Sequence, residues 1–309
     1  MNGGMAKVAI IGGSGFIGSH TAIELMSHDH DVTIIDIQSP GSFQVFDKVD
    51  DIIYADATDY PSILKALDNN FDYVYMLAAI SDACENIKQP LMAVNSNIVS
   101  LVNVLHAISS LNIPRIIFSS TVWVYSVCDL VDVNEESNLS ITNSDHIYTT
   151  CKLTCEALIR HYHQIYNIQY TILRYGIAYG PGCHPDTILS RFMTNAINGE
   201  PLVITGDGSI YRNFLNVMDH ARGNRLAMTQ AACNQIINLE GPEKVTLTRV
   251  AERVKELHGD VDIIYTDQRS GDYVGRNVSN QKAEELLNWM PIITFDNGTL
   301  NMYNNFISK

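Results

Sequence analysis

The first 175 residues alternate short β-rich runs with longer amphipathic stretches, and this alternation restricts the chain to one class of fold. The β-rich runs are 7–13, 31–36, 72–79, 115–120 and 170–175. The helical stretches between them are 19–27, 60–67, 90–111 and 148–166. Strict alternation implies right-handed crossover connections and a parallel sheet with helices on both faces. We therefore predict a doubly wound α/β fold.

The pattern changes after Tyr175, where the loop GIAYGPGCHPDT leads into a mixture of short helices and strands. Such a segment is typical of a smaller α/β domain that closes over the carboxyl edge of the sheet, where ligands of these folds bind. We expect residues 1–176 to form the large domain, with 213–238 returning to it. The smaller domain is then expected to comprise 177–212 and 239–309.

A glycine pattern follows the first strand directly. Gly12, Gly15 and Gly18 in GGSGFIG have the spacing GxxGxxG and stand between a strand and a helix. The glycines allow a tight turn and close backbone approach, so that a pyrophosphate can lie against the free amides of the helix N-terminus. This context indicates a dinucleotide site in the large domain.

The type of dinucleotide follows from the end of the second strand. Asp36 can accept hydrogen bonds from both ribose hydroxyls of an adenosine but would repel a 2′-phosphate. The next residues, Ile37, Gln38 and Ser39, include no arginine or lysine that would bind that phosphate. We therefore predict NAD rather than NADP as the cofactor.

The charge of the chain limits its partners. The 309 residues carry 34 acidic and 20 basic side chains, for a net charge of −14, without a basic block that could follow a nucleic-acid backbone. The N-terminus fits neither a signal peptide nor a membrane span, and six scattered cysteines lack the spacing of a metal or disulfide site. We expect a cytoplasmic protein without a metal, a membrane or a nucleic acid as partner.

The stretch HIYTTCK places Tyr148 four residues before Lys152 in a predicted helix. Residues four apart share a helix face, so the phenol and the ammonium could work as an acid/base pair. The spacing alone leaves open that both residues only decorate the helix surface.

The order of these motifs resembles the extended short-chain dehydrogenase/reductase family. The motifs are, in chain order, GGSGFIG, Asp36, LAA (77–79), FSSTVWVY (118–125) and YTTCK (148–152). LRYGIAYGPG (173–182), GDGSIYRNFLNVMD (206–219), RSGD (269–272) and LLNWMP (286–291) are similar to the markers of nucleotide-sugar epimerases and dehydratases. The likeness spans nearly the whole chain and is greatest to the UDP-sugar 4-epimerases. It implies a Rossmann domain that binds NAD and a smaller nucleotide-sugar domain.

The resemblance also implies a role for each matching residue. The catalytic residues would be Thr121, Tyr148 and Lys152. The residues that bind NAD would be Gly12, Gly15, Phe16, Ile17, Gly18, Asp36, Ile37, Asp56, Ala57, Leu77, Ala78, Ala79, Asn95, Ser119, Tyr148, Lys152 and Tyr175. The residues that bind the nucleotide sugar would be Ser81, Thr121, Tyr148, Arg212, Arg269 and Arg276.

The chemistry of a sugar oxidation explains the catalytic residue types. A base must take the hydroxyl proton, and a free tyrosine with a pKa of about 10 is a poor base at neutral pH. A nearby ammonium and a cationic nicotinamide both favour the phenolate. Thr121 can hydrogen-bond the reacting oxygen and orient it.

The pair of residues that directly follows the catalytic threonine helps to distinguish the reactions of this family. In this family 4,6-dehydratases carry an Asp-Glu pair there, whereas this chain has Val122 and Trp123, which cannot transfer protons. A 4-epimerase needs no such pair, and it is our leading interpretation. A 4-reductase or dehydrogenase, a dehydratase and a non-catalytic NAD-binding regulatory protein remain alternatives.

The substrate-binding motifs depart from the family pattern at three positions. Ile177 replaces a common asparagine, Ser126 a glycine and Ser81 a lysine, which leaves open an unusual sugar or an unusual nucleotide. Arg276 could pair with a carboxylate on the sugar, as in a uronic acid, or could be an ordinary exposed arginine. The resemblance further implies a homodimer formed through 90–111 and 148–166.

Overall fold

Runs of valine, isoleucine and leucine form a central parallel sheet. The computed structural model describes residues 4–38, 51–68, 70–144, 146–267 and 275–308. Within these residues the sheet has seven strands in the order β11-β7-β5-β4-β1-β2-β3, and all its pairs are parallel. The strands are β1 (Lys7–Ile11), β2 (Asp31–Asp36), β3 (Asp51–Tyr54), β4 (Tyr73–Met76), β5 (Arg115–Thr121), β7 (Gln169–Tyr175) and β11 (Gln235–Leu239). The predicted doubly wound fold is confirmed.

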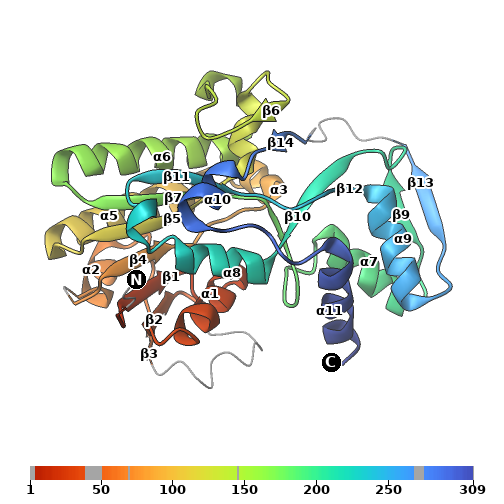
Figure 1. Cartoon of the computed structure of the whole chain (residues 1–309), viewed down its shortest axis with the longest axis horizontal. Coiled ribbons are helices and arrows are strands. Elements are labelled where there is room, and N and C mark those ends of the chain that lie inside the picture. The colour runs from red at the N-terminus through yellow and green to blue at the C-terminus, as the bar shows by residue number, and fades with distance from the viewer. Residues whose placement is uncertain (1–3, 39–50, 69, 145, 268–274, 309) are drawn as a thin grey trace.

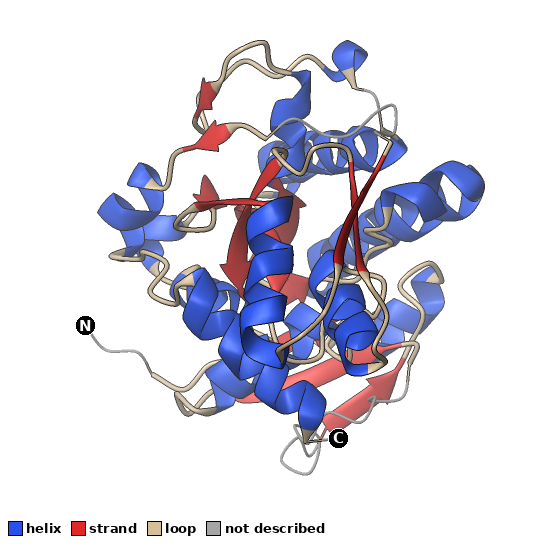
Figure 2. Cartoon of the chain, turned by 90° about the vertical axis from the view of Figure 1, so that its right-hand side faces the viewer, coloured by secondary structure: helices blue, strands red, loops and turns tan. Residues whose placement is uncertain are grey.

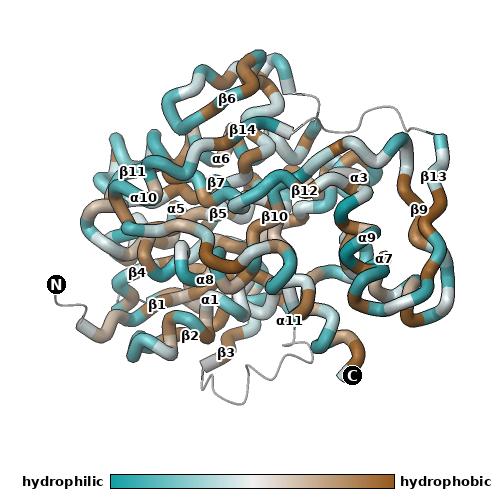
Figure 3. Tube along the Cα trace, turned by 45° about the vertical axis from the view of Figure 1, so that its right-hand side comes forward, coloured by the Kyte–Doolittle hydropathy of each residue, from teal (hydrophilic) through white to brown (hydrophobic). Residues whose placement is uncertain are grey.

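Helices cover both faces of this sheet (Figures 1 and 2). One face packs against α2 (Tyr60–Ala66), α5 (Ser100–Leu111) and α6 (Ile147–Tyr166). The other face packs against α1 (Phe16–Met26), α8 (Val217–Leu226) and α10 (Gln281–Leu287). Both interfaces are apolar, and much of the trace through the sheet has the brown of hydrophobic residues in Figure 3. Burial on both faces explains why these strands read as nearly continuous apolar runs.

The long helix predicted over 90–111 is interrupted. It consists of α4 (Pro90–Val94), a π-helical turn at Asn95–Val99, and α5. The short helix α3 (Ala83–Lys88) precedes it. In the turn the Asn97 side chain is buried and donates through Nδ2 to the carbonyls of Ala93 (2.9 Å) and Ile80 (3.3 Å). The turn therefore directs Asn97, not Asn95, toward the loop after β4.

Strand β3 was not predicted, because its four residues are too short a run to stand out as a β pattern. Among the described helices, Pro90–Leu111 alone is long and apolar enough to cross a membrane by length and composition. Its Leu101, Val104, Leu105 and Ile108 are buried in the core beside the sheet.

The C-terminal elements form a second core beside the large sheet, on the right in Figure 1. Phe192, Phe214, Val250 and Phe295 are buried together there. Its strands are β8 (Ile177–Tyr179), β10 (Tyr211–Asn216) and β12 (Lys244–Thr246) in one sheet, and β9 (Leu202–Thr205) with β13 (Ile263–Thr266) in another. Its helices are α7 (Ile188–Ile197), α9 (Leu247–His258) and α11 (Phe295–Ile307). A small lobe above the large sheet contains β6 (Asp132–Val133) and β14 (Asn277–Val278).

Because α8 and β11 pack with the large sheet while β10 and β12 belong to the second core, the chain crosses between the two parts more than once. The helix α10 also returns to the large sheet, where Ala283 and Leu287 are buried. The boundaries of the two domains stay a prediction.

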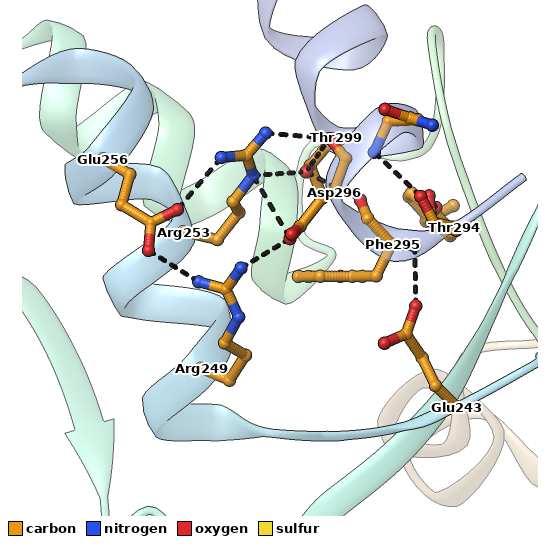
Figure 4. Close-up of polar contacts among 10 residues, drawn as sticks. Glu243, Arg249, Arg253, Glu256, Thr294, Phe295, Asp296 and Thr299 are labelled. Atoms are coloured by element: carbon orange, nitrogen blue, oxygen red, sulfur yellow. Dashed lines mark hydrogen bonds and ion pairs between the residues drawn. The ribbon is translucent and has the colours of Figure 1, made fainter.

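An ionic cluster joins α9 to α11 (Figure 4). We call Arg249, Arg253, Glu256 and Asp296 the α9/α11 cluster. Glu256 accepts from Arg249 at 2.8 Å and from Arg253 at 2.9 Å, and Asp296 accepts from Arg249 at 2.5 Å. Both carboxylates are at least half exposed. The cluster therefore connects α9 and α11 through ion pairs that are exposed to solvent.

Candidate active site

The turn between β1 and α1 has no room for side chains at its first and third glycines. Gly12 has a φ of 85°, and a Cβ there would lie 2.4 Å from the Ala78 nitrogen. A Cβ on Gly18 would lie 2.2 Å from the Gly12 carbonyl oxygen. No side chain caps α1 at Gly15, so the N–H groups of its first turn face the opening of the turn. The arrangement fits an anionic group at the helix N-terminus.

Asp36 lies beside this turn at the end of β2. Its Oδ2 accepts from the Ser14 N–H at 2.9 Å and its Oδ1 from the Gln38 N–H at 3.0 Å. Ile37 is 65% exposed. Asp56 is exposed and accepts from Thr58, while Ala57 is buried after β3. Asp36 ends β2 and the other three residues follow β2 or β3, at the same edge of the sheet as the glycine turn.

A cavity of about 470 Å³ opens at this edge. It collects most of the predicted site residues, although they come from distant parts of the sequence. The predicted residues that line it are Gly12, Gly15, Phe16, Ile17, Gly18, Leu77, Ala79, Ser81, Ser119, Thr121, Tyr148, Lys152 and Tyr175. Trp123, Ile177, Cys183, His184 and Thr187 also line it and were not predicted. Among the described lining residues there is no carboxyl group.

Several predicted residues do not line the cavity. Ala78 lies behind it against Gly12, and Asp36, Ile37, Asp56 and Ala57 lie along the same sheet edge outside it. Asn95 is exposed on the π-helical turn. Arg269 lies outside the described residues.

Tyr148 and Lys152 are adjacent on α6 and both are buried, at 9% and 2% exposure. The Lys152 Nζ lies 5.7 Å from the centre of the Tyr148 ring and donates to the Ser119 carbonyl at 2.6 Å. Burial lowers the pKa of Lys152 to about 8, and the nearby Glu156 carboxylate acts in the opposite direction. The ammonium therefore remains mostly charged at neutral pH.

Burial raises the pKa of the Tyr148 phenol above its ordinary value, with smaller contributions from Cys155 and Cys151. Among the described residues its hydroxyl has no hydrogen-bond partner. The chain alone therefore holds Tyr148 as a neutral phenol, and an added positive charge would be needed to stabilise the phenolate.

Thr121 ends β5 and is 7% exposed. Its Oγ1 accepts from the Trp123 N–H at 3.2 Å, which starts the 3₁₀ helix Val122–Val127. The hydroxyl proton remains available for a ligand. Val122 points into a small apolar cluster with Val124 and Tyr125.

A buried polar network that the sequence did not predict lies behind Thr121. Glu156 forms a bidentate ion pair with Arg174, at 3.0 and 2.7 Å, and both side chains are 3% exposed. Ser120 donates to Glu156 at 2.5 Å, and Arg174 donates to the Tyr125 hydroxyl at 2.9 Å. The Tyr125 hydroxyl donates to Asn238 on β11 at 2.8 Å. The network thus joins α6, β5, β7 and β11 directly behind the cavity.

Two sequence signals could have revealed this network. Glu156 stands four residues after Lys152 and so continues the Tyr148–Lys152 face of the helix. Arg174 is a charge inside an otherwise buried strand, and such charges are rarely buried without a partner.

A second, narrow cavity adjoins the first and shares Trp123 and Ile177 with it. Arg212 and Arg276, both predicted to bind substrate, line it together with Glu240. Arg212 donates to the Tyr211 carbonyl and Arg276 to the Cys128 carbonyl, each at 2.9 Å. The structure thus brings two predicted arginines to one place beside the main cavity.

Comparisons with known proteins agree with this geometry. A model described as the NAD-dependent epimerase/dehydratase family matches residues 8–239. A putative UDP-glucose 4-epimerase of Methanocaldococcus jannaschii is 26% identical, covering 96% of this chain and 97% of the relative. UDP-glucuronic acid decarboxylase 6 of Arabidopsis thaliana is 28% identical, covering 97% and 88%. The solved structure of UDP-glucose 4-epimerase from Thermotoga maritima with UDP-glucose has a TM-score of 0.91 at 25% identity, covering 98% of this chain and 99% of that one.

Proposed function

The chain belongs to the NAD-dependent epimerase/dehydratase family, and from this premise we propose that it is a nucleotide-sugar 4-epimerase. The observation that carries the proposal is the cavity where Thr121, Tyr148 and Lys152 meet the glycine turn without a carboxyl group among the described lining residues. Its expected reaction is transient oxidation at C4 of the sugar, followed by reduction from the other face.

The chain's own groups fit NAD. The glycine turn and the uncapped N-terminus of α1 suit a pyrophosphate, and the Asp36 carboxylate suits an unphosphorylated ribose. When bound, NAD supplies a reversible acceptor for the hydride that leaves C4. We assign the pyrophosphate to Gly12, Gly15, Phe16, Ile17 and Gly18.

The remaining NAD contacts are also proposals. Asp36 with Ile37 would meet the adenosine ribose, and Asp56 with Ala57 would flank the adenine. Leu77, Ala78, Ala79, Asn95, Ser119 and Tyr175 would support the rest of the cofactor.

The proton transfer falls to three side chains. The Tyr148 phenolate would take the proton of the C4 hydroxyl and return it after the sugar has turned over. Lys152 would stabilise that phenolate by its charge, since its Nζ is held near the ring by the Ser119 carbonyl. The Thr121 hydroxyl would hydrogen-bond the C4 oxygen and hold it toward Tyr148.

The lack of a carboxyl among the described lining residues favours epimerisation over dehydration, which needs proton transfer at carbons next to C4. A decarboxylase or a one-way 4-reductase would use the same triad. A 4-reductase would consume a reduced cofactor, whereas a 4-epimerase recycles its NAD. A non-catalytic NAD-binding protein would not need the buried Lys152.

For the substrate we propose that Arg212 and Arg269 meet the diphosphate or the nucleotide. Guanidinium groups suit these anions because their N–H donors are arranged as a fork. Ser81 would contact the sugar, and Arg276 would meet an anionic substituent such as the carboxylate of a uronic acid. Ile177 in the cavity wall offers no polar contact at the place where the family has an asparagine.

We further propose a cytoplasmic homodimer. The side of the long helix turned away from the sheet exposes Leu91 (88%), Met92, Val94 and Val99. Together with the outer face of α6 it would form a four-helix interface across a two-fold axis. Size-exclusion chromatography with light scattering would test this.

The function is tested by incubating purified protein with UDP-, GDP-, CDP- and dTDP-sugars, without added NAD, and following C4 inversion by NMR. We expect one nucleotide sugar to convert to its C4 epimer, with NAD already bound to the protein. Tyr148→Phe should retain NAD while its turnover falls by about 10²–10⁴-fold. Turnover that requires added NADH, or a deoxy or decarboxylated product, would contradict the proposal.

A further inference from the structure

Asn224 is a fully buried amide on α8 whose side chain connects a strand to a helix. Its Oδ1 accepts from the Tyr175 hydroxyl, and its Nδ2 donates to the Thr21 hydroxyl at 2.7 Å. Tyr175 ends β7, whereas Thr21 belongs to α1. We call Tyr175, Asn224 and Thr21 the α8 bridge.

Both ends of the α8 bridge reach the main cavity. Tyr175 itself lines the cavity. At the other end the Thr21 Oγ1 donates to the Ile17 carbonyl at 2.8 Å, and Ile17 lines the cavity from the first turn of α1. The bridge therefore passes through the core behind the cavity and joins two of its walls.

The donors and acceptors of the α8 bridge determine which way the amide is oriented. The Ile17 carbonyl can only accept, so the Thr21 hydroxyl donates its one proton there and must accept from Asn224. The Asn224 nitrogen is that donor, which leaves the Asn224 oxygen to accept from Tyr175. A carboxamide supplies both functions, whereas an aspartate or a leucine of similar size does not.

Other contacts fix Asn224 and Tyr175 relative to each other. The hydroxyl of the fully buried Tyr75 on β4 donates to the Asn224 backbone carbonyl at 2.8 Å. His220, four residues earlier on α8, is also fully buried, and its ring packs at 75° against the Tyr175 ring with centroids 4.8 Å apart. Helix α8 thus contacts Tyr175 at both its hydroxyl and its ring.

We propose that Asn224 is a positioning residue for NAD, which holds the first turn of α1 and the Tyr175 wall at a fixed spacing. The inference rests on the proposed function, in which Ile17 and Tyr175 both contact the cofactor. Walls that are already fixed need no ordering when NAD binds, so less of the binding free energy is lost. Among related variants such a gain appears mainly as slower dissociation.

The chain offers two matched controls that separate this role from core stability. Tyr75 and Tyr175 are both buried tyrosines that donate to Asn224, but only Tyr175 donates to the side chain and lines the cavity. Tyr75→Phe therefore removes a buried bond and leaves the α8 bridge intact. Thr21→Val keeps the shape of the side chain and loses the hydroxyl, whereas Thr21→Ser keeps the hydroxyl and loses the methyl group.

The test measures the rate at which the holoenzyme loses NAD, by chasing it with excess 1,N6-etheno-NAD and following the fluorescence of the analogue. Tyr175→Phe, Thr21→Val and Asn224→Leu should each raise this rate about tenfold, as expected for one lost hydrogen bond. Tyr75→Phe and Thr21→Ser should leave the rate unchanged. The double variant Tyr175→Phe with Thr21→Val should also be raised about tenfold, because each single change already breaks the same bridge.

A rise of about a hundredfold in the double variant would show independent effects and overturns the proposal. An unchanged rate in Tyr175→Phe overturns it too, as does a rise in Tyr75→Phe or Thr21→Ser equal to that in Thr21→Val. If Tyr175→Phe fails to fold, Thr21→Val against Thr21→Ser decides the question from the other end of the bridge.

The same experiment distinguishes this proposal from the proposed function. A holoenzyme that shows the expected rates but epimerises no nucleotide sugar overturns the proposed function alone. A wild-type protein that is purified without NAD and binds no etheno-NAD overturns both.

Discussion

Two ionic clusters in the described part of the chain differ in their exposure to solvent. The Glu156–Arg174 pair behind the cavity is 3% exposed on both sides, whereas Glu256 and Asp296 of the α9/α11 cluster are 50% and 55% exposed. The N···O distances are short in both clusters, so distance does not distinguish their contributions to stability. Burial distinguishes them. When an exposed charge loses its partner, water solvates it, but a buried charge that loses its partner has no water to solvate it.

The difference teaches that these two clusters have different uses. The α9/α11 cluster ties two helices together and has no contact with the cavity. The buried pair joins the helix that carries Tyr148 and Lys152 to the strand that ends in Thr121. A change in it should therefore affect stability and catalysis together.

Breaking the buried pair should give the largest effect. Glu156→Gln leaves the Arg174 charge buried without a counter-charge, and we expect a loss of about 3–5 kcal/mol in the free energy of unfolding. Urea denaturation followed by circular dichroism would measure it. A loss below 1 kcal/mol would mean that the pair behaves like the exposed cluster.

Removing both buried charges should cost less than removing one. In Glu156→Leu with Arg174→Met neither charge remains, and we expect stability within about 2 kcal/mol of wild type, with the lost bonds to Ser120 and Tyr125 as the main cost. The double-mutant cycle with the two single variants gives the coupling energy. Additive losses would show that the two side chains act independently.

The pH dependence of turnover should respond to the Glu156–Arg174 pair and not to the α9/α11 cluster. Lys152 has its pKa lowered to about 8, and the Glu156 charge opposes that lowering. Activity that needs the ammonium should be present below pH 8 and fall as the pH rises through it. Glu156→Gln should move this alkaline limb down by roughly 0.5–1 pH unit.

The matched variant Arg249→Ala should leave that limb unchanged. A profile of kcat from pH 6 to pH 10 at low temperature, where both variants are folded, makes the comparison. An unmoved limb in Glu156→Gln would restrict the buried pair to a structural role.

The exposed cluster should give the smallest effect. Arg249→Ala removes contacts to two half-exposed carboxylates, and we expect a loss of less than about 1 kcal/mol, which decreases at 1 M salt. Arg253→Ala should cost more, because Arg253 is 15% exposed and also donates to the Thr299 hydroxyl and the Asp296 carbonyl. Thermal unfolding at two salt concentrations tests both.

The sequence predicted the features that depend on local order. The glycine turn and the Tyr148–Lys152 spacing each lie within seven residues, and strand alternation determined the parallel sheet. The sequence did not reveal the Glu156–Arg174 pair, because its members and Ser120 come from separate elements of the chain and their importance comes from burial. Nor did it reveal the π-helical turn that brings Asn97 to the Ile80 carbonyl, since such a turn cannot be inferred from a hydrophobic pattern.

The positions of the two tryptophans allow ligand binding and unfolding to be followed by intrinsic fluorescence. Trp123 stands in the wall of the cavity, whereas Trp289 is fully buried and donates from its indole nitrogen to the Asp219 carbonyl at 3.1 Å. Ligands that enter the cavity should alter the emission of Trp123 and leave that of Trp289 almost constant. Loss of the native core should instead shift Trp289 to longer wavelengths. One fluorescence spectrum thus records occupancy and folding through separate signals.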